Sequence, residues 1–211
     1  QDLNAQLDNL ERVLLAFGSK HDAQFEKFEA QILTGLTDFE SFEQSHEKLG
    51  YLLGFQVGNM ETSGAPDPYW ITRTKCFVFE DHANADHNSV LSVSKARQVD
   101  AHPKWMTENI DLAQDKKIYA VLVSPVSKVD QGGHASLKNV SYWHLNGFIE
   151  WAKSALINIR ALRADLTEVG DLEWRAKAIT ILEDNRMTSS TLVEFFNSSN
   201  AYHELEAVDF G

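Results

Sequence analysis

Two acidic residues, Asp67 and Glu80, are the side chains of this chain best placed to do chemistry. Asp67 stands at a turn between two prolines, which fix their own backbone angles and restrict the residues before them. Residues 69–71 and 76–79 are apolar and predict two strands, and the polar residues 72–75 between them suit a turn. A hairpin of this length brings its ends together, so Asp67 and Glu80 should lie side by side. Two carboxylates held close repel each other, and a hard divalent cation such as Mg²⁺ relieves the repulsion.

Hydrolysis of a phosphodiester is one reaction that such a site supports, because a metal ion polarises the phosphate and lowers the pKa of a bound water. Asp67, Glu80 and the backbone carbonyl of Asp81 could together hold one ion. Glu43, on a helix expected before the hairpin, could hold the ion through water or complete a second site. Each acid also has a plain structural interpretation, since an aspartate between prolines is a common turn residue and a glutamate at a strand end is ordinary.

The elements that must position these residues begin with helices. Residues 1–49 contain no proline and predict two or three amphipathic helices, with apolar residues at three- and four-residue spacing. Thr37-Asp38 can cap the last of them, which is expected from about Phe39 to Leu53. A short first strand, Gly54–Val57, and a polar loop, Gly58–Gly64, then lead into the hairpin.

The residues after the hairpin predict one more strand and several helices. Strand-edge residues and then a helix are expected from Val90 to about Ile110, with Pro103 interrupting the pattern. Lys117–Val123 is the clearest buried strand. The order helix, three strands, helix, strand, helix suits an α/β fold with a small mixed sheet and helices on both faces. The remaining segments are expected as a polar loop at Ser127–Asn139, amphipathic helices at Trp143–Ala164, Leu172–Asp184 and Ser189–Asn197, and a peripheral acidic tail after Ser198.

The composition is that of an ordinary globular protein, with 43% hydrophobic and 24% charged residues among 211. No apolar run reaches the roughly 18 residues of a membrane-spanning helix, and no signal peptide is visible. The single cysteine, Cys76, excludes a disulfide framework or a cysteine zinc site within this chain and fits a reducing, cytoplasmic location. The chain begins at Gln1 rather than methionine, which is compatible with a segment of a longer protein.

Three segments, in this order, carry a likeness to a known family. They are Phe42-Glu43 through Leu49-Gly50-Tyr51-Leu52-Leu53-Gly54-Phe55; Gly64-Ala65-Pro66-Asp67 with Trp70 and Phe77-Val78-Phe79-Glu80, followed by His82; and Val93-Ser94-Lys95 with Gln98 and Trp105. On these residues the chain resembles the PD-(D/E)xK nuclease superfamily. Within it, the chain is similar to the restriction-endonuclease-like domains often attached to DEAD/DEAH-type helicases of prokaryotic defence loci.

The resemblance implies a metal-dependent endodeoxyribonuclease, with DNA as substrate and a helicase domain or protein as a candidate partner. It implies Mg²⁺ as the cofactor, with Mn²⁺ as an alternative. The expected division of the chain is a helical extension or linker at 1–37, a restriction-endonuclease-like core at 38–166, and C-terminal helices packed on the core at 167–211.

The resemblance also assigns the metal ligands. In the family the aspartate and the glutamate bind Mg²⁺, which implies that role for Asp67 and Glu80. A glutamate on the preceding helix joins them, and the spacing matches Glu43 better than Glu47.

The lysine of the family motif, which assists the attacking water, is replaced here by His82. A histidine can donate a hydrogen bond or act as a base near neutral pH. Lys95, on the next helix, could instead supply the missing ammonium, as migrated lysines do elsewhere in the superfamily. Gln98 matches a glutamine that orients active-site or DNA groups in many members.

Other functions stay open at this point. A catalytically degenerate nuclease fold used for interaction or DNA sensing fits His82 in place of lysine and the net charge of −12, which disfavours broad affinity for nucleic acid. RNA or another phosphodiester is a weaker alternative, because no RNA-recognition signature is present. His82, Asp86 and His87 lie close in sequence, but they lack a zinc-binding spacing motif.

Overall fold

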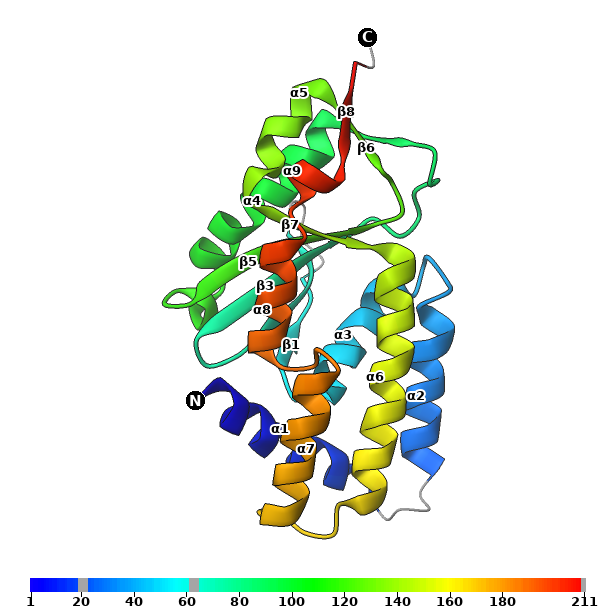
Figure 1. Ribbon diagram of the computed structural model, residues 1–211, viewed down its shortest axis with the longest axis vertical. Coiled ribbons are helices and arrows are strands. Elements are labelled where there is room, and N and C mark those ends of the chain that lie inside the picture. The colour runs from blue at the N-terminus through cyan, green and yellow to red at the C-terminus, as the bar shows by residue number, and fades with distance from the viewer. Residues whose placement is uncertain (19–22, 61–64, 210–211) are drawn as a thin grey trace.

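A mixed five-stranded sheet forms the centre of the molecule, and helices cover both of its faces (Figure 1). The computed structural model describes residues 1–18, 23–60 and 65–209, so Gly64 and the end of the predicted loop at 58–64 lie outside the described residues. In the order β1-β2-β3-β5-β7, the first three strands run antiparallel and the last three run parallel. The strands are β1 Gln56–Gly58, β2 Asp67–Ile71, β3 Lys75–Asp81, β5 Lys117–Ser124 and β7 Val140–His144.

The predicted hairpin is present as β2 and β3, and its pairing explains why its two acidic ends meet. Asp67 pairs with Phe79, directly before Glu80, and the register shifts between Asp67 and Tyr69. The turn is closed by the Thr72 N–H, which donates to the carbonyl of residue 75 at 2.8 Å. The start of β2 therefore lies beside the carboxyl end of β3.

One face of the sheet, which carries Phe77 and Phe79, packs in a single hydrophobic core with the N-terminal and C-terminal helices. Leu7 of α1 and Phe25 of α2 belong to this core, so the expected extension at 1–37 packs against the rest of the chain. The boundaries proposed at 37/38 and 166/167 stay predictions. These helices are α1 Asp2–Ala16, α2 Ala23–Gly35, α3 Phe42–Leu52, α6 Leu145–Asp165, α7 Leu172–Asp184 and α8 Ser189–Ser198.

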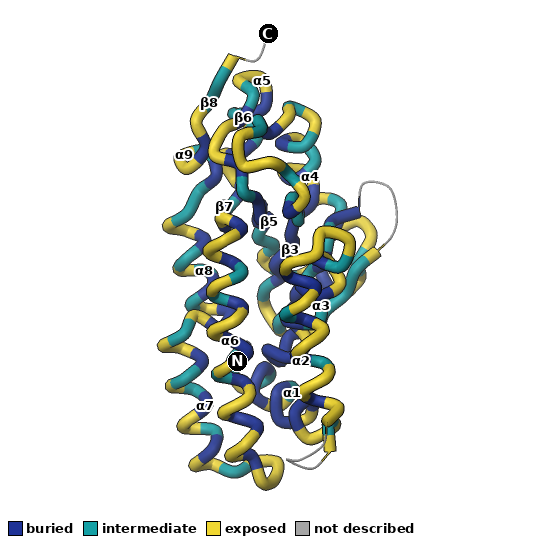
Figure 2. The backbone as a smooth tube through the Cα atoms, turned by 90° about the vertical axis from the view of Figure 1, so that its right-hand side faces the viewer, coloured by how far each residue is buried: buried dark blue, intermediate teal, exposed yellow. Residues whose placement is uncertain are grey.

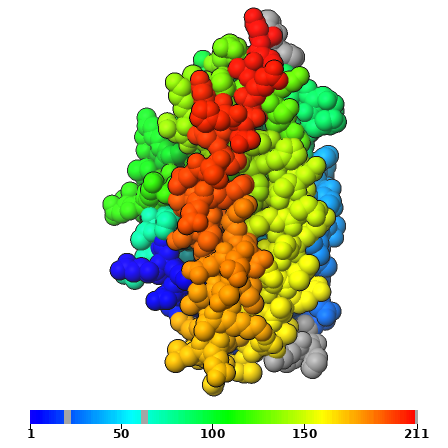
Figure 3. All heavy atoms as spheres, in the orientation of Figure 1, coloured from blue at the N-terminus to red at the C-terminus, as the bar shows by residue number. Residues whose placement is uncertain are grey.

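Helices α6, α7 and α8 close this side of the molecule, and their atoms form one continuous wall in the space-filling view (Figure 3). Buried and exposed residues alternate along these helices (Figure 2), and the buried apolar ones belong to the first core. This distribution is the one expected of amphipathic helices on a buried sheet.

The opposite face of the sheet, which carries Cys76 and Val78, forms a second core with α4, Val93–Asn109. Near α4 lies a small parallel sheet in the order β4-β6-β8. Its strands are β4 Val90–Leu91, β6 Lys128–Asp130 and β8 Glu206–Val208. The remaining short elements are the 3-10 helices η1 Asp111–Ala113 and η2 Ala135–Asn139, and the helices α5 Gln131–His134 and α9 Ala201–Glu204.

The predicted α/β class, a small mixed sheet flanked by helices, is confirmed. The predicted start of the third helix at Phe39 is wrong, because Asp38 accepts hydrogen bonds from the Glu40 N–H and the Ser41 hydroxyl and holds a turn there. Helix α3 therefore begins only at Phe42.

The predicted break at Pro103 is also wrong, since α4 continues through it. Val99 and His102 before Pro103, and Met106 after it, are all buried. Burial on both sides of the proline thus keeps the helix continuous despite the missing N–H.

The segment after β5 is more ordered than the sequence indicates. Residues 127–139, predicted as a loop, contain β6, α5 and η2. Trp143, predicted in a helix, lies in β7 opposite Val123. The tail, predicted as peripheral, contributes β8 and buries Ala201 and Leu205 in the second core. Among the described residues, no helix is both long and apolar enough to cross a bilayer.

Candidate functional site

The alternation of side chains along β3 sends its last two acids to opposite faces of the sheet. Cys76 and Val78 belong to the second core, so Glu80, in the same phase, faces α4. Phe77 and Phe79 belong to the first core, so Asp81 faces α3. The site is thus built around the carboxyl end of β3, with different partners on each side of the sheet.

Glu80 is held from α4 by two side chains. Its Oε1 accepts a hydrogen bond from Lys95 Nζ, and its Oε2 lies 2.6 Å from His102 Nε2. The Glu80 side chain is 2% exposed and that of Lys95 is 30% exposed. Burial raises the pKa of Glu80, but the hydrogen bonds from His102 and Lys95 and the Lys95 charge outweigh it, and the pKa lies below its ordinary value. Glu80 is therefore a carboxylate at neutral pH.

Asp81 is held from α3 by His46, with Nδ1 lying 2.9 Å from Oδ1 and 2.8 Å from Oδ2. Both side chains are almost fully buried. The imidazole packs among aromatic rings, with centroids 4.3 Å from Phe79 and 4.5 Å from Phe148. Its Nε2 is buried with no hydrogen-bond partner in the described part of the chain. An N–H there would be left unsatisfied, so the proton of a neutral His46 belongs on Nδ1, which donates to Asp81.

Asp67 lies between these two acids and Glu43. Its Oδ2 accepts the backbone N–H of Asp81 at 2.7 Å. Burial, and then the negative charges of Glu80, Asp81 and Glu43, raise the pKa of Asp67 to about 8. At neutral pH Asp67 is therefore protonated in the metal-free protein.

Glu43 is the helix glutamate that meets Asp67. Burial and the charge of Asp81 raise its pKa, and a side-chain hydrogen bond with Asp67 opposes that rise. A protonated Asp67 that donates a hydrogen bond to Glu43 accounts both for the raised pKa of Asp67 and for the opposing effect of Asp67 on the pKa of Glu43. Glu47 lies elsewhere on α3, where its charge acts on Tyr69. Of the two glutamates, Glu43 is therefore the one that acts on Asp67, and its role as a metal ligand stays a prediction.

His82 lies close enough to Lys95 and Glu80 to be affected by their charges, and Gln98 lies on the same helix as Lys95. His82 Nδ1 lies 3.1 Å from Ser124 Oγ. Burial and the Lys95 charge lower the pKa of His82, while Glu80 opposes the shift, so the imidazole is neutral at pH 7. Gln98 lies one turn after Lys95 on α4, and within the described residues its side chain makes no hydrogen bond. Lys95, and not His82, supplies the ammonium beside Glu80.

The structure does not assemble the zinc ligands considered from the sequence. His87 Nδ1 lies 3.6 Å from Asp86 Oδ1 on the exposed loop, whereas His82 turns to Ser124. Across residues 1–18, 23–60 and 65–209, no group of three His, Cys, Asp or Glu side chains is arranged to hold a metal ion.

A pair of carboxylates still suits Mg²⁺, which keeps several waters and is commonly bound by one or two carboxylates. Glu43 and Asp67 share a hydrogen bond that requires a proton, and a cation could replace that proton. Both carboxylate oxygens of Glu80 are already hydrogen-bonded, one to Lys95 and the other to His102. Asp67 and Glu43 therefore fit as ligands of Mg²⁺. Glu80 would not bind the ion directly and would contribute only its nearby negative charge.

His46 and His102 are functional candidates that the sequence analysis did not select. His46 follows Glu43 by one helical turn, and His102 follows Lys95 by two turns on the same face of α4. Helical spacing from Glu43 and Lys95 is the signal that could have found both.

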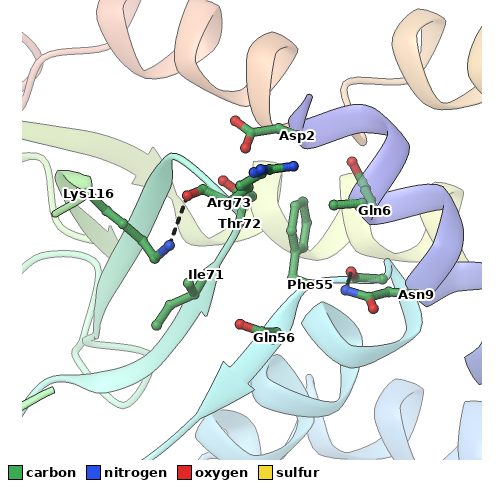
Figure 4. Close-up of a pocket in the computed structure, with 11 residues that line it drawn as sticks. Asp2, Gln6, Asn9, Phe55, Gln56, Ile71, Thr72, Arg73 and Lys116 are labelled. Atoms are coloured by element: carbon green, nitrogen blue, oxygen red, sulfur yellow. Dashed lines mark hydrogen bonds between the residues drawn. The ribbon is translucent and has the colours of Figure 1, made fainter. Parts of the chain in front are cut away.

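A separate hollow of about 250 Å³ lies at the junction of α1, β1 and the β2–β3 turn (Figure 4). Lys116 closes one side by donating from Nζ to the carbonyl of Arg73 at 2.9 Å, and Asn9 and Gln56 line another (Figure 4). Asp67 does not line this hollow, so it is distinct from the acidic cluster.

Comparison with protein-family models gives no match, and no curated protein matches the chain. The likeness to PD-(D/E)xK nucleases thus rests on the motif residues themselves.

Proposed function

We propose that this chain is a Mg²⁺-dependent nuclease domain that hydrolyses DNA phosphodiester bonds. The observation that carries the proposal is the crowding of Glu43, Asp67 and Glu80 beside one ammonium, that of Lys95. Mutual repulsion raises the pKa of crowded carboxylates. Such a cluster gains stability when a divalent cation replaces the shared proton. A cytoplasmic location and a link to a helicase-type defence protein are part of the proposal and rest on Cys76 and on the family resemblance.

In this proposal Asp67 and Glu43 would hold the metal ion, which would supply polarisation of the scissile phosphate and a lower pKa for a bound water. The protein residues do the rest. Lys95 is fixed by Glu80, and its remaining N–H groups can donate to a phosphate oxygen or to the attacking water. His82 is neutral and partly buried, so it can accept a proton.

Cleavage of single- and double-stranded DNA with Mg²⁺ or Mn²⁺ tests this proposal. Asp67→Asn keeps an oxygen that can accept the Asp81 N–H but removes the negative charge. We expect it to abolish both metal-dependent cleavage and Mg²⁺ binding in calorimetry. Asp115→Asn is the matched control, because Asp115 is exposed and lies just before β5, at the opposite end of the strand. Full activity in Asp67→Asn would remove this site from the mechanism.

A second candidate function is a nuclease-like module that binds partners or DNA without hydrolysis. It is favoured by the saturation of both Glu80 oxygens and by the lack of a three-ligand group in the described part of the chain. This candidate predicts no Mg²⁺ binding at millimolar concentrations. A calorimetric isotherm that disappears in Glu80→Ala would contradict it.

A further inference from the structure

A cleft opens directly beside the acidic cluster. A small cavity of about 70 Å³ is bounded by Glu43, Asp81 and Asn84. Phe39, Phe42 and Ala83 line that cavity and also line a larger cleft of about 540 Å³. The two hollows therefore share the wall formed by these three residues, with Glu43 and Asp81 on the side of the smaller cavity.

Phe39 forms one wall of this cleft with a ring that is 64% exposed. The turn that carries it is fixed, because the Asp38 carboxylate accepts from the Glu40 N–H at 3.3 Å and from the Ser41 hydroxyl at 2.7 Å. Phe42, at the base, is buried and packs on Phe148 with ring centroids 5.8 Å apart. A hydrogen-bonded turn thus holds the Phe39 ring at the surface, where the ring adds nothing to the buried core.

A second part of the wall comes from two loops at the carboxyl ends of the parallel strands. The loop after β3 contributes Asp86 and His87, and the junction of β7 and α6 contributes His144 and Asn146. His144 Nδ1 accepts the Asn146 N–H at 3.2 Å, which orients this imidazole at the start of α6. The wall therefore offers hydrogen-bonding groups on planar side chains.

The chemistry of the lining selects a class of ligand. None of the described residues that line the cleft is Lys or Arg, so a phosphate is not the group it recognises. A cleft lined by an exposed aromatic ring and by polar, planar side chains suits a neutral planar ring with a polar edge. A nucleobase has this form, and every base has a π-face on which an aromatic side chain can stack.

We infer that this cleft holds one unpaired base of a DNA strand whose backbone lies at Asp67 and Glu43. The inference rests on the proposed function and narrows its substrate to DNA with a single-stranded or displaced nucleotide at the cleavage site. The base in a duplex is stacked and paired, and only an unpaired base can enter such a cleft without the cost of unstacking. With a chain charge of −12, stacking provides affinity that phosphate contacts do not.

Fluorescence of a short single strand containing 2-aminopurine tests this inference, with Ca²⁺ in place of Mg²⁺. Wild-type protein should quench the base analogue, and Phe39→Ala should weaken binding of the single strand about tenfold and abolish quenching. Phe39→Tyr, which keeps an aromatic ring, should retain both. Leu172→Ala is the matched control, because Leu172 is 80% exposed and lies at the start of α7. A blunt duplex should bind no more weakly to Phe39→Ala than to wild type.

Several outcomes would overturn the inference: equal binding of the single strand by wild type and Phe39→Ala, no binding by either, or an equal loss for the duplex. Such a result, together with cleavage that depends on Asp67, would leave the nuclease standing and remove only the base-binding cleft. Quenching that depends on Phe39 without any metal-dependent cleavage would retain the base-binding cleft and reject hydrolysis. The binding readout thus separates the two proposals.

Discussion

Glu80 and His102 are joined at 2.6 Å between Oε2 and Nε2, and both side chains are almost completely buried. The contact links the last strand residue that faces α4 to the middle of that helix. Lys95 takes the other Glu80 oxygen from the first turn of the same helix. The two residues of α4 therefore fix both the position and the charge of Glu80.

Loss of the His102 donor should destabilise the protein. His102→Leu leaves a buried Glu80 oxygen without a partner, and we expect the free energy of unfolding in urea to fall by about 1–3 kcal/mol. Since the folded pKa of Glu80 is depressed, this stabilisation is present above the ordinary value of 4.5 and is lost as the pH falls through the lower folded value. The double variant Glu80→Met, His102→Leu should recover part of the loss. An equal or larger loss in the double variant would contradict this account.

The raised pKa of Asp67 predicts a pH-dependent gain in Asp67→Asn. The folded protein holds this proton up to about pH 8, whereas the unfolded chain releases it near 3.8, so wild-type stability falls as pH rises between these values. Asparagine does not ionise. In metal-free buffer the stability of Asp67→Asn relative to wild type should therefore increase from pH 5 to pH 8 and level off above it. A difference between the variant and wild type that is constant with pH would rule this out.

We predict that His46 positions Asp81. The backbone N–H of Asp81 donates to Asp67, so His46 also positions Asp67 indirectly. His46→Ala leaves a buried carboxylate unpaired and should lower the free energy of unfolding by about 3 kcal/mol. His46→Asn places an amide N–H near the Nδ1 position and should restore much of this stability. Mg²⁺ affinity should follow the same order, which a purely structural role in the aromatic core would not require. Calorimetry on the two variants, each checked for folding, measures this.

The short-range part of this site was accessible from sequence. Strand alternation and a short turn are enough to bring Asp67 to Glu80, and helical spacing is enough to place Lys95 on the helix that follows. The sequence did not indicate that the Asp81 side chain lies on the opposite face of the sheet from Glu80. That assignment depends on which of the two cores each alternating set of β3 side chains packs into. His46 was missed although it follows Glu43 by one helical turn, because its partner Asp81 across the sheet is known only once the fold is known.

Long-range pairing accounts for the larger errors. Residues 128–130 form a strand only because β4 and β8 lie on either side of them, and both partners are distant in sequence. A polar, glycine-containing segment carries no such information locally. The prediction at Pro103 erred in the opposite direction, since the helix continues where a break was expected. Burial against the sheet outweighs the local cost of a proline within α4.

Cys76 offers a direct probe of the integrity of the sheet. Its side chain is fully buried in β3, and burial raises the pKa of the thiol to about 12. Because the thiolate is the reactive form, a thiol reagent at pH 8 should modify the folded protein very slowly and the urea-unfolded protein at the rate of an ordinary thiol. Rapid modification in the absence of urea would show that β3 opens readily. The same assay on His46→Ala would report whether that variant keeps its sheet closed.

The pairing of Lys128 with Glu206 has a consequence for the time course of folding. The whole of β7, α6, α7 and α8 lies between these two residues in sequence. Closure of so long a loop is entropically slow, and contacts of this separation form late. During synthesis, the side of β6 that pairs with β8 therefore stays unpaired until β8 has been made. We expect refolding to show a slow final phase, associated with β8, after the main sheet and its helices have already formed.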